Sequence, residues 1–182
     1  MRVDFILDHE PCSINVTAEL SLFSILKESD PPPRNQPPRV PPFRSQPPFE
    51  ECGNRCCGYC VVLFNDYMAP SCLLPAFKLM GGRVETASGL MKQDTFSHIQ
   101  QGFEEAGYYP CKICRHSAII LCEYILRREG GAPRTSNLIG RLGPELCGCA
   151  SRRRFIEGLQ IAYTLRHHRS YRRNIHAEKT ET

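Results

Sequence analysis

The spacing of the cysteines constrains the fold of this chain more than any other feature of its sequence. Eight of its 11 cysteines fall into two sets of four, and the two sets differ in spacing. The first set is Cys52, Cys57, Cys60 and Cys72, and the second is Cys111, Cys114, Cys147 and Cys149. Four thiolates brought to one point bind a soft metal centre, so the sequence predicts two separate metal sites.

Composition is typical of a globular chain. The 182 residues are 41% apolar and 23% charged, which allows one mid-sized domain or two small ones. The first five residues are too charged for a secretory signal, and no apolar run approaches the roughly 20 residues of a membrane span. We therefore expect a cytoplasmic chain with no membrane partner. In a reducing compartment many cysteines favour metal binding over a disulfide framework.

Positive charge is concentrated near the C-terminus. The net charge is +4, and arginines cluster at residues 152–154 and 166–173. A nucleic-acid surface would need aromatic stacking residues beside the arginines, and only Tyr163 and Tyr171 are near. We expect a solvated basic face and no nucleic-acid partner.

The N-terminal half reads as β-structure. Apolar residues alternate over residues 3–7 and 12–16, on either side of a turn at residues 8–11, which predicts a β-hairpin. A second strand pair is predicted at residues 60–64 and 83–86, with turn chemistry at Asn65-Asp66.

A proline-rich arm follows the first predicted helix. Residues 21–28 carry a helical apolar face, and the prolines from Pro31 onward forbid its continuation. Residues 31–48 contain paired prolines, which favour an extended polyproline II arm. The arm is either a tolerated surface insertion or a docking site for a proline-reading module.

The second half reads as helices. Apolar residues recur at helical spacing over residues 96–106, and residues 117–128 form a nearly all-apolar helix. A short helix is predicted around residues 135–142, and a last helix is marked by apolar residues from Phe155 to Tyr163.

The first cysteine set has the Cys-x4-Cys-x2-Cys spacing of plant-type [2Fe–2S] ferredoxins. Such a cluster needs a loop whose backbone N–H groups point at its sulfides. We expect Cys52 and Cys57 to bind from the loop, Cys60 from the start of a strand, and Cys72 from across the sheet. A zinc ribbon normally shows two CxxC pairs instead.

The second set is less specific. A CxxC pair with a distant CxC holds zinc in a tetrahedral site as readily as it holds iron, so its spacing alone leaves both metals open. Of the three remaining cysteines, we expect Cys12 and Cys122 to be small buried residues and Cys56 to be an exposed, oxidisable thiol.

Several segments, taken in order, resemble one known family. They are Cys57-Gly58-Tyr59-Cys60-Val61-Val62-Leu63, Ser71-Cys72-Leu73, Ile99-Gln100-Gln101-Gly102-Phe103 and Leu146-Cys147-Gly148-Cys149. Over about residues 2–163 the chain resembles the iron–sulfur subunit of the molybdenum hydroxylases, which include xanthine dehydrogenase, aldehyde oxidoreductase and carbon monoxide dehydrogenase. Residues between the ligands depart from the family pattern, as at Pro110, where a glutamine is expected.

The resemblance implies an α+β chain with two domains. Residues 1–90 would form a β-grasp, plant-type ferredoxin-like domain with the proline-rich insertion at 31–48. Residues 91–166 would form an all-α, four-helix domain, and residues 167–182 a basic, flexible tail. Each domain would bind one [2Fe–2S] cluster. The first would use Cys52, Cys57, Cys60 and Cys72, and the second Cys111, Cys114, Cys147 and Cys149.

The resemblance also implies a function. The chain would be a non-catalytic electron-transfer subunit of an oxidoreductase, relaying electrons from a molybdopterin-binding large subunit towards an FAD-binding subunit or another acceptor. No catalytic set of side chains can be assembled from the sequence. The alternative is a zinc-stabilised or degenerate protein-interaction module that uses the proline-rich arm and the arginine-rich tail.

Overall fold

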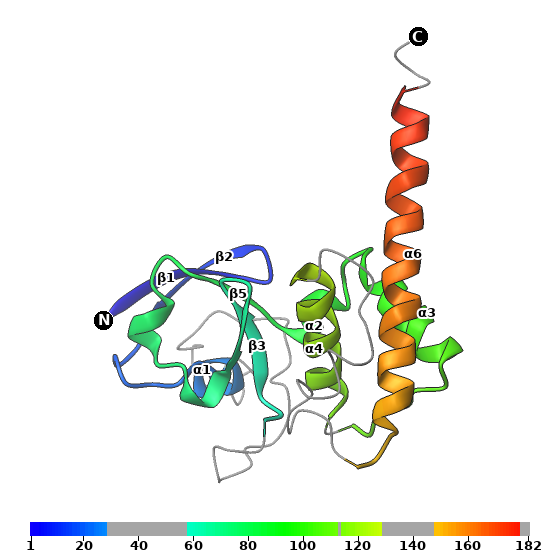
Figure 1. Cartoon of the computed structure of the whole chain (residues 1–182). Coiled ribbons are helices and arrows are strands. Elements are labelled where there is room, and N and C mark those ends of the chain that lie inside the picture. The colour runs from blue at the N-terminus through cyan, green and yellow to red at the C-terminus, as the bar shows by residue number, and fades with distance from the viewer. Residues whose placement is uncertain (29–57, 113, 129–147, 179–182) are drawn as a thin grey trace, which may run out of the picture.

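A mixed β-sheet and a group of helices lie side by side in this protein (Figure 1). The computed structural model describes residues 1–28, 58–112, 114–128 and 148–178, and for residues 168–178 it describes the backbone alone. Strands dominate the first half and helices the second, so the expected α+β class is confirmed.

The predicted N-terminal hairpin is present. Strands β1 (Arg2–Leu7) and β2 (Glu10–Asn15) pair antiparallel, with the buried residues of β1 alternating along the strand. The turn is shorter than predicted, because Asp8 and His9 alone make it, with φ angles of 49° and 72°. Pro11 lies within β2 and pairs with Ile6, at the edge of the sheet.

Three further strands complete the sheet in the order β2-β1-β5-β3-β4. Strand β3 (Val61–Phe64) pairs antiparallel with β5 (Arg83–Glu85), as predicted, and β5 runs parallel to β1. The sequence did not predict β4 (Tyr67–Pro70), which pairs antiparallel with β3. Asn65 and Asp66 link β3 to β4 and both have positive φ, the backbone that a tight two-residue hairpin requires.

One core lies between the sheet and helix α1 (Leu22–Glu28), which confirms the predicted first helix to within one residue. Two short 3₁₀ helices, η1 (Ser71–Leu73) and η2 (Ala76–Leu79), carry the chain from β4 towards β5. The buried residues of this core are Val3, Phe5, Leu7, Cys12, Ile14, Leu22, Ile25, Leu26, Val62, Leu74, Ala76, Leu79 and Val84.

A second core is built mainly from helices. They are α2 (Ala87–Leu90), α3 (Phe96–Glu105), α4 (Arg115–Arg128) and α6 (Arg152–Glu178). Both α3 and α4 were predicted, and α4 begins two residues earlier than expected. The predicted helix around residues 135–142 and the proline-rich arm lie outside the described residues.

Helix α6 is longer than the sequence suggested. It continues through the predicted tail as far as Glu178, and Figure 1 shows its C-terminal part projecting away from the other elements. The flexibility of the tail, like the domain boundaries at residues 90 and 166, stays a prediction.

Strand β3 contributes to both cores. Val61 and Leu63 pack in the helical core, whereas Val62 between them packs in the core against α1. Alternate residues of a strand point to opposite faces, so the sheet is covered on both faces at this strand. The two halves of the chain therefore share a structural element.

The turn of the first hairpin also joins the two halves. The carboxylate of Asp8 accepts hydrogen bonds from the backbone N–H and the hydroxyl of Thr86, at 2.7 and 2.8 Å. Thr86 in turn caps α2, because its side chain accepts from the N–H of Gly89. Burial raises the pKa of Asp8, although these hydrogen bonds oppose the rise.

Helices α3 and α6 approach closely through glycines. A Cβ atom added to Gly102 would lie 2.4 Å from the carbonyl oxygen of Gly158 and 2.9 Å from the backbone nitrogen of Ala162. Phe103, Tyr108 and Phe155 pack beside this contact, edge-on or tilted to one another, with ring centroids 4.9–5.8 Å apart.

Among the residues described, no helix combines the length and apolarity needed to cross a membrane, and the expected cytoplasmic location stays a prediction.

Candidate metal centres

Three cysteines of the second set converge at the ends of two helices. Cys111 and Cys114 flank the first turn leading into α4, and Cys149 lies just before α6. The Sγ atoms of Cys111 and Cys114 are 3.3 Å apart, and those of Cys114 and Cys149 are 3.1 Å apart. All three Sγ atoms lie within 4.8 Å of one another. Cys147, the fourth predicted ligand, lies outside the described residues.

The surroundings of these three thiols suit anionic sulfur. The backbone N–H of Cys111 donates to Sγ of Cys149 across 3.4 Å. Cys114 is buried and its carbonyl accepts from Ala118, so its thiol lies at the N-terminal end of α4, where the helix dipole favours negative charge. Cys149 is exposed. The donor set is entirely thiol, which fits a soft metal or an iron–sulfur cluster.

The structure brings together two cysteines of the first set. Cys60 precedes β3 and Cys72 lies in η1, and their Sγ atoms are 3.2 Å apart. The chain reaches Cys60 through Gly58, whose φ of 73° is a conformation that favours glycine. Cys52 and Cys57, together with the unassigned Cys56, lie outside the described residues.

Cys12 and Cys122 belong to neither group. Both are buried, as predicted, one in each core. Burial raises the pKa of the Cys12 thiol to about 12, and burial raises that of Cys122 as well. These two cysteines therefore remain protonated and serve as small apolar side chains.

Comparison of the whole fold finds solved structures of similar architecture. Quinoline 2-oxidoreductase from Pseudomonas putida 86 matches with a TM-score of 0.72 and 22% identity, over 92% of this chain and 96% of the matched chain. Aldehyde oxidoreductase from Desulfovibrio gigas matches with a TM-score of 0.72 and 14% identity, over 93% of this chain and 17% of the matched chain. At these identities the matches show a shared fold.

Comparison of sequences finds relatives of the same kind, while no family model matches the chain. One probable xanthine dehydrogenase subunit, from Bacillus subtilis, is 30% identical over 98 residues, which are 54% of this chain and 56% of the relative. One nicotinate dehydrogenase subunit, from Pseudomonas putida, is 27% identical over 100 residues, which are 55% of this chain and 63% of the relative. The chain is similar in sequence to these dehydrogenase subunits and to aldehyde oxidases. The resemblance inferred from its motifs is thereby confirmed.

The chain spans only part of the length of these relatives. Aldehyde oxidase 3 from Rattus norvegicus is 28% identical in an alignment of length 117 that covers 58% of this chain and 9% of that protein. The two bacterial proteins are covered over little more than half of their length.

A charged network joins the sheet to the helices. The guanidinium of Arg127 on α4 contacts Glu85 of β5 at 2.6 Å and Glu123 at 2.8 Å, and it also reaches Asp66 at 3.0 Å. Arg166 of α6 contacts Glu123 at 2.7 Å. Both glutamates are buried. Of this network the sequence offered only one signal, the i, i+4 spacing of Glu123 and Arg127.

The network determines the ionisation of its members. Burial raises the pKa of Glu123, but the hydrogen bonds and positive charges of Arg166 and Arg127 outweigh burial and leave it below the usual range. The hydrogen bond to Glu85 is the largest cause of a raised pKa for Arg127. Glu123 and Arg127 are therefore charged at neutral pH, and burial makes their pairing necessary.

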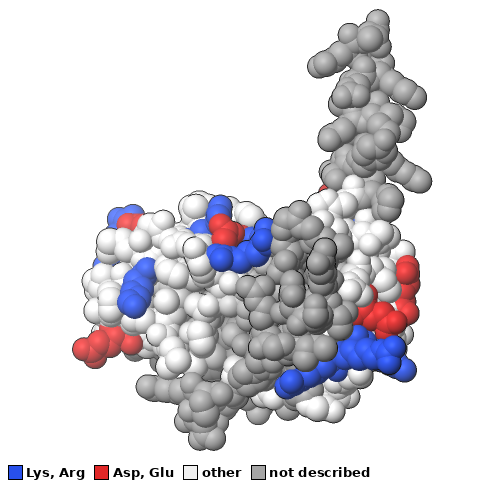
Figure 2. All heavy atoms as spheres, in the orientation of Figure 1, with Lys and Arg blue, Asp and Glu red and all other residues white. Residues whose placement is uncertain are grey.

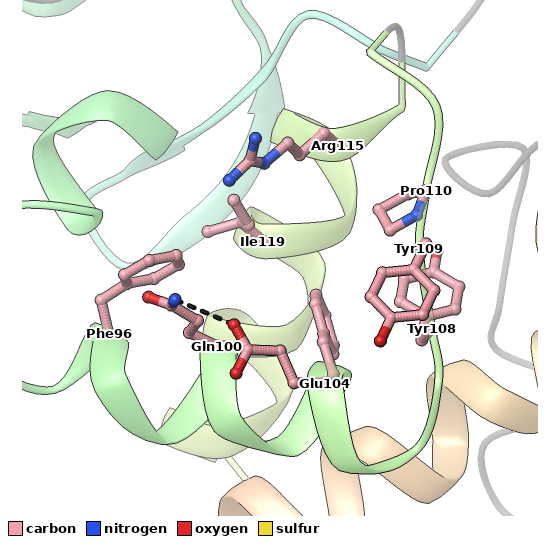
Figure 3. Close-up of a pocket in the computed structure, with 9 residues that line it drawn as sticks. Phe96, Gln100, Glu104, Tyr108, Tyr109, Pro110, Arg115 and Ile119 are labelled. Carbon is pink, nitrogen blue, oxygen red and sulfur yellow. Dashed lines mark hydrogen bonds between the residues drawn. The ribbon is translucent and has the colours of Figure 1, made fainter.

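A pocket of about 250 Å³ adjoins the second cysteine group (Figure 3). Pro110 and Arg115, which directly flank the Cys111–Cys114 segment in sequence, line it. Gln100 and Glu104 of α3 line it too, joined by a hydrogen bond of 2.9 Å. Its remaining lining residues are Phe96, Phe103, Tyr108, Tyr109 and Ile119. Sequence analysis did not predict this pocket, because its residues come from separate segments.

On the face shown in Figure 2, basic side chains lie beside acidic ones at several places. Among the exposed ion pairs of the protein is that of Arg83 and Asp66, with an N–O distance of 2.7 Å. The predicted absence of a nucleic-acid partner stays a prediction.

Proposed function

We propose that this chain is an electron-transfer subunit that binds two [2Fe–2S] clusters. The convergence of Cys111, Cys114 and Cys149 carries the proposal, because Cys149, at least 35 positions from the other two, presents its thiol at the same point. The relatives named as dehydrogenase subunits and the shared fold support it. The proposed ligands are Cys52, Cys57, Cys60 and Cys72 for the first cluster, and Cys111, Cys114, Cys147 and Cys149 for the second.

A bound [2Fe–2S] cluster supplies one-electron redox chemistry, and the chain sets its position and potential. At the second site, the N–H of Cys111 and the N-terminal end of α4 stabilise anionic sulfur. At the first site, Cys60 and Cys72 approach from two segments of the sheet region. We also propose the finer layout expected from the sequence. The sheet half would be a β-grasp, ferredoxin-like domain, and the helical half a four-helix domain.

The proposal includes two partners. Electrons would arrive from a molybdopterin-binding large subunit and leave towards an FAD-binding subunit. The names of the dehydrogenase relatives, which are given as subunits, support an assembly of several chains. Coexpression with a candidate molybdopterin-binding chain and size-exclusion chromatography test this part, and we expect the two chains to elute as one complex. Separate elution of two folded chains would refute the assembly.

Metal analysis and electron paramagnetic resonance test the clusters. Protein purified without oxygen should contain about four irons per chain and give two distinct signals on reduction. Cys114→Ser should remove one signal and Cys60→Ser the other. Cys122→Ala, which alters a buried cysteine outside both groups, should retain both signals. Colourless protein that contains zinc and no iron would refute the proposal.

One observation favours the zinc-stabilised alternative at the second site. Two sulfurs bound to one tetrahedral zinc ion at about 2.3 Å lie about 3.8 Å apart, and two of the Sγ pairs here are already as close as 3.3 and 3.1 Å. A single ion would serve structure rather than electron transfer. In that case the purified protein holds zinc, and Cys114→Ser unfolds the helical half instead of removing one signal.

A further inference from the structure

Ser71 lies beside Cys60 across the β3–β4 ladder. The register pairs Val61 with Pro70, so the next position outward places Ser71 opposite Cys60. A hydrogen bond of 2.8 Å from the N–H of Ser71 to the carbonyl of Cys60 continues the ladder to this position. Directly opposed residues of an antiparallel pair project to the same face of the sheet, with Cβ atoms about 4.5–5.5 Å apart. The hydroxyl and the Cys60 thiol therefore share one face.

The Ser71 hydroxyl is buried without a hydrogen-bond partner among the described residues. Its residue is 0% exposed, and Oγ contacts no acceptor or donor there. A buried hydroxyl without a partner costs free energy, and native proteins rarely leave one in that state. Ser117, which is equally buried, shows the usual solution, because its hydroxyl donates to the carbonyl of Cys114 at 3.0 Å.

The chemistry around Ser71 is rich in sulfur. Cys72 follows it in sequence, and the Cys72 thiol lies 3.2 Å from that of Cys60. Neither thiol accepts a hydrogen bond from the Ser71 hydroxyl in the described residues, so the acceptor sulfur would be one that a bound centre brings. Hydrogen bonds to cluster sulfur are among the features by which a protein sets a reduction potential.

We propose that the Ser71 hydroxyl donates a hydrogen bond to a sulfur atom of the first cluster and raises its reduction potential. This inference rests on the proposed function. Reduction adds one electron to the centre and increases the negative charge on its sulfurs, so the hydrogen bond is stronger in the reduced state. Ser71 is thus a tuning residue that acts through the cluster.

Ser71→Ala tests the inference, with Ser117→Ala as the matched control at a buried serine whose hydroxyl has a protein acceptor. The first-cluster signal is identified as the one that Cys60→Ser removes. In redox titrations followed by electron paramagnetic resonance, Ser71→Ala should lower the equilibrium constant for one-electron reduction of that cluster on the order of tenfold. For one electron this equals a potential shift of about 59 mV. The second signal should keep its potential.

Metal-free protein provides a second readout. Without the cluster the Ser71 hydroxyl makes no hydrogen bond among the described residues that the substitution could remove. Ser71→Ala should therefore unfold at the same urea concentration as the wild type or at a higher one. Ser117→Ala loses a hydrogen bond and should unfold at a lower concentration.

The possible outcomes distinguish failure of this inference from failure of the proposed function. An unchanged first-cluster potential in Ser71→Ala, with both signals present, would overturn the inference and leave the proposed function intact. Metal-free Ser71→Ala destabilised as much as Ser117→Ala would assign Ser71 a structural role and also overturn it. Wild-type protein without a first-cluster signal would refute the proposed function, and the inference with it.

Discussion

The guanidinium of Arg127 lies 2.6 Å from the carboxylate of Glu85, and this contact joins helix α4 to strand β5. Glu85 is only 3% exposed, so its charge depends on the arginine for compensation. Strand β5 belongs to the sheet half, and α4 begins at the second cysteine group. The ion pair therefore holds the helix that follows this cysteine group against the sheet.

Replacement of Arg127 by methionine should strongly destabilise the protein. The change leaves Glu85 and Glu123 buried with one fewer positive partner, and breaking a buried pair costs about 3–5 kcal/mol. The free energy of unfolding, measured with urea and circular dichroism, checks this. Arg2→Met is the control, since Arg2 and its partner Asp4 are both exposed, and a loss below about 1 kcal/mol is expected. Equal losses of unfolding free energy in the two variants would show that burial does not make the Arg127 ion pairs more important for stability than an exposed pair.

Glu123 should make the stability depend on pH in acid. Its pKa in the folded protein lies below the ordinary value of 4.5, so the folded state binds fewer protons than the unfolded state. The stabilisation is therefore fully present above pH 4.5 and is lost as the pH falls through the folded pKa.

Comparison with Glu123→Gln isolates this effect. Urea unfolding of the metal-free wild type and variant between pH 6 and pH 3 should give a stability difference that is constant near pH 6 and shrinks below pH 4.5. Glu10→Gln, at an exposed position on β2, controls for the loss of one negative charge. A difference that grows as the pH falls would contradict the assignment.

The cysteines should differ sharply in reactivity in the reduced, metal-free protein. Thiolate is the nucleophile, and a thiol with a pKa of about 12, as at Cys12, is ionised at pH 8 in about one molecule in 10⁴. Iodoacetamide followed by peptide mass spectrometry should therefore modify the exposed Cys149 well before Cys12 and Cys122. In urea the three should react at similar rates. Early labelling of Cys122 in the folded protein would show that its core opens.

Gly102→Ala should destabilise the protein, although alanine is the better helix former. The added Cβ would lie 2.4 Å from the carbonyl oxygen of Gly158, so α3 and α6 would have to separate. Overpacking of this kind costs about 1–3 kcal/mol, measured as the free energy of unfolding. Glu105→Ala, at an exposed position on the same helix, should change it by less than about 0.5 kcal/mol. A stabilised Gly102→Ala variant would disprove the close approach.

The sequence predicted the elements whose signal is local. Alternation at the N-terminus identified the β1–β2 hairpin, and helical spacing identified α3 and α4. Strand β4 was missed because its four residues end in proline and do not alternate between apolar and polar. The strand forms because Asn65 and Asp66 adopt positive φ and turn the chain back along β3. The sequence identified a turn at these residues but not the strand that follows it.

The candidate centres were predicted through spacing, and the features around them were not. Five of the eight predicted ligands lie in the described residues, and they form one pair and one group of three. Neither the ion-pair partners of Glu85 nor the position of Ser71 beside Cys60 could be predicted, because both depend on how segments distant in sequence lie against each other. Charge pairing across 42 positions has no periodic signal in a single sequence.

Strand β3 restricts how a chain of this kind can change over time. A shift of its register by one residue would exchange the faces of Val62 and its two neighbours, so both cores would have to repack at once around apolar side chains of different shape. Cys60, at the head of this strand, would turn to the opposite face as well. The length of this strand is therefore constrained from both of its faces at once.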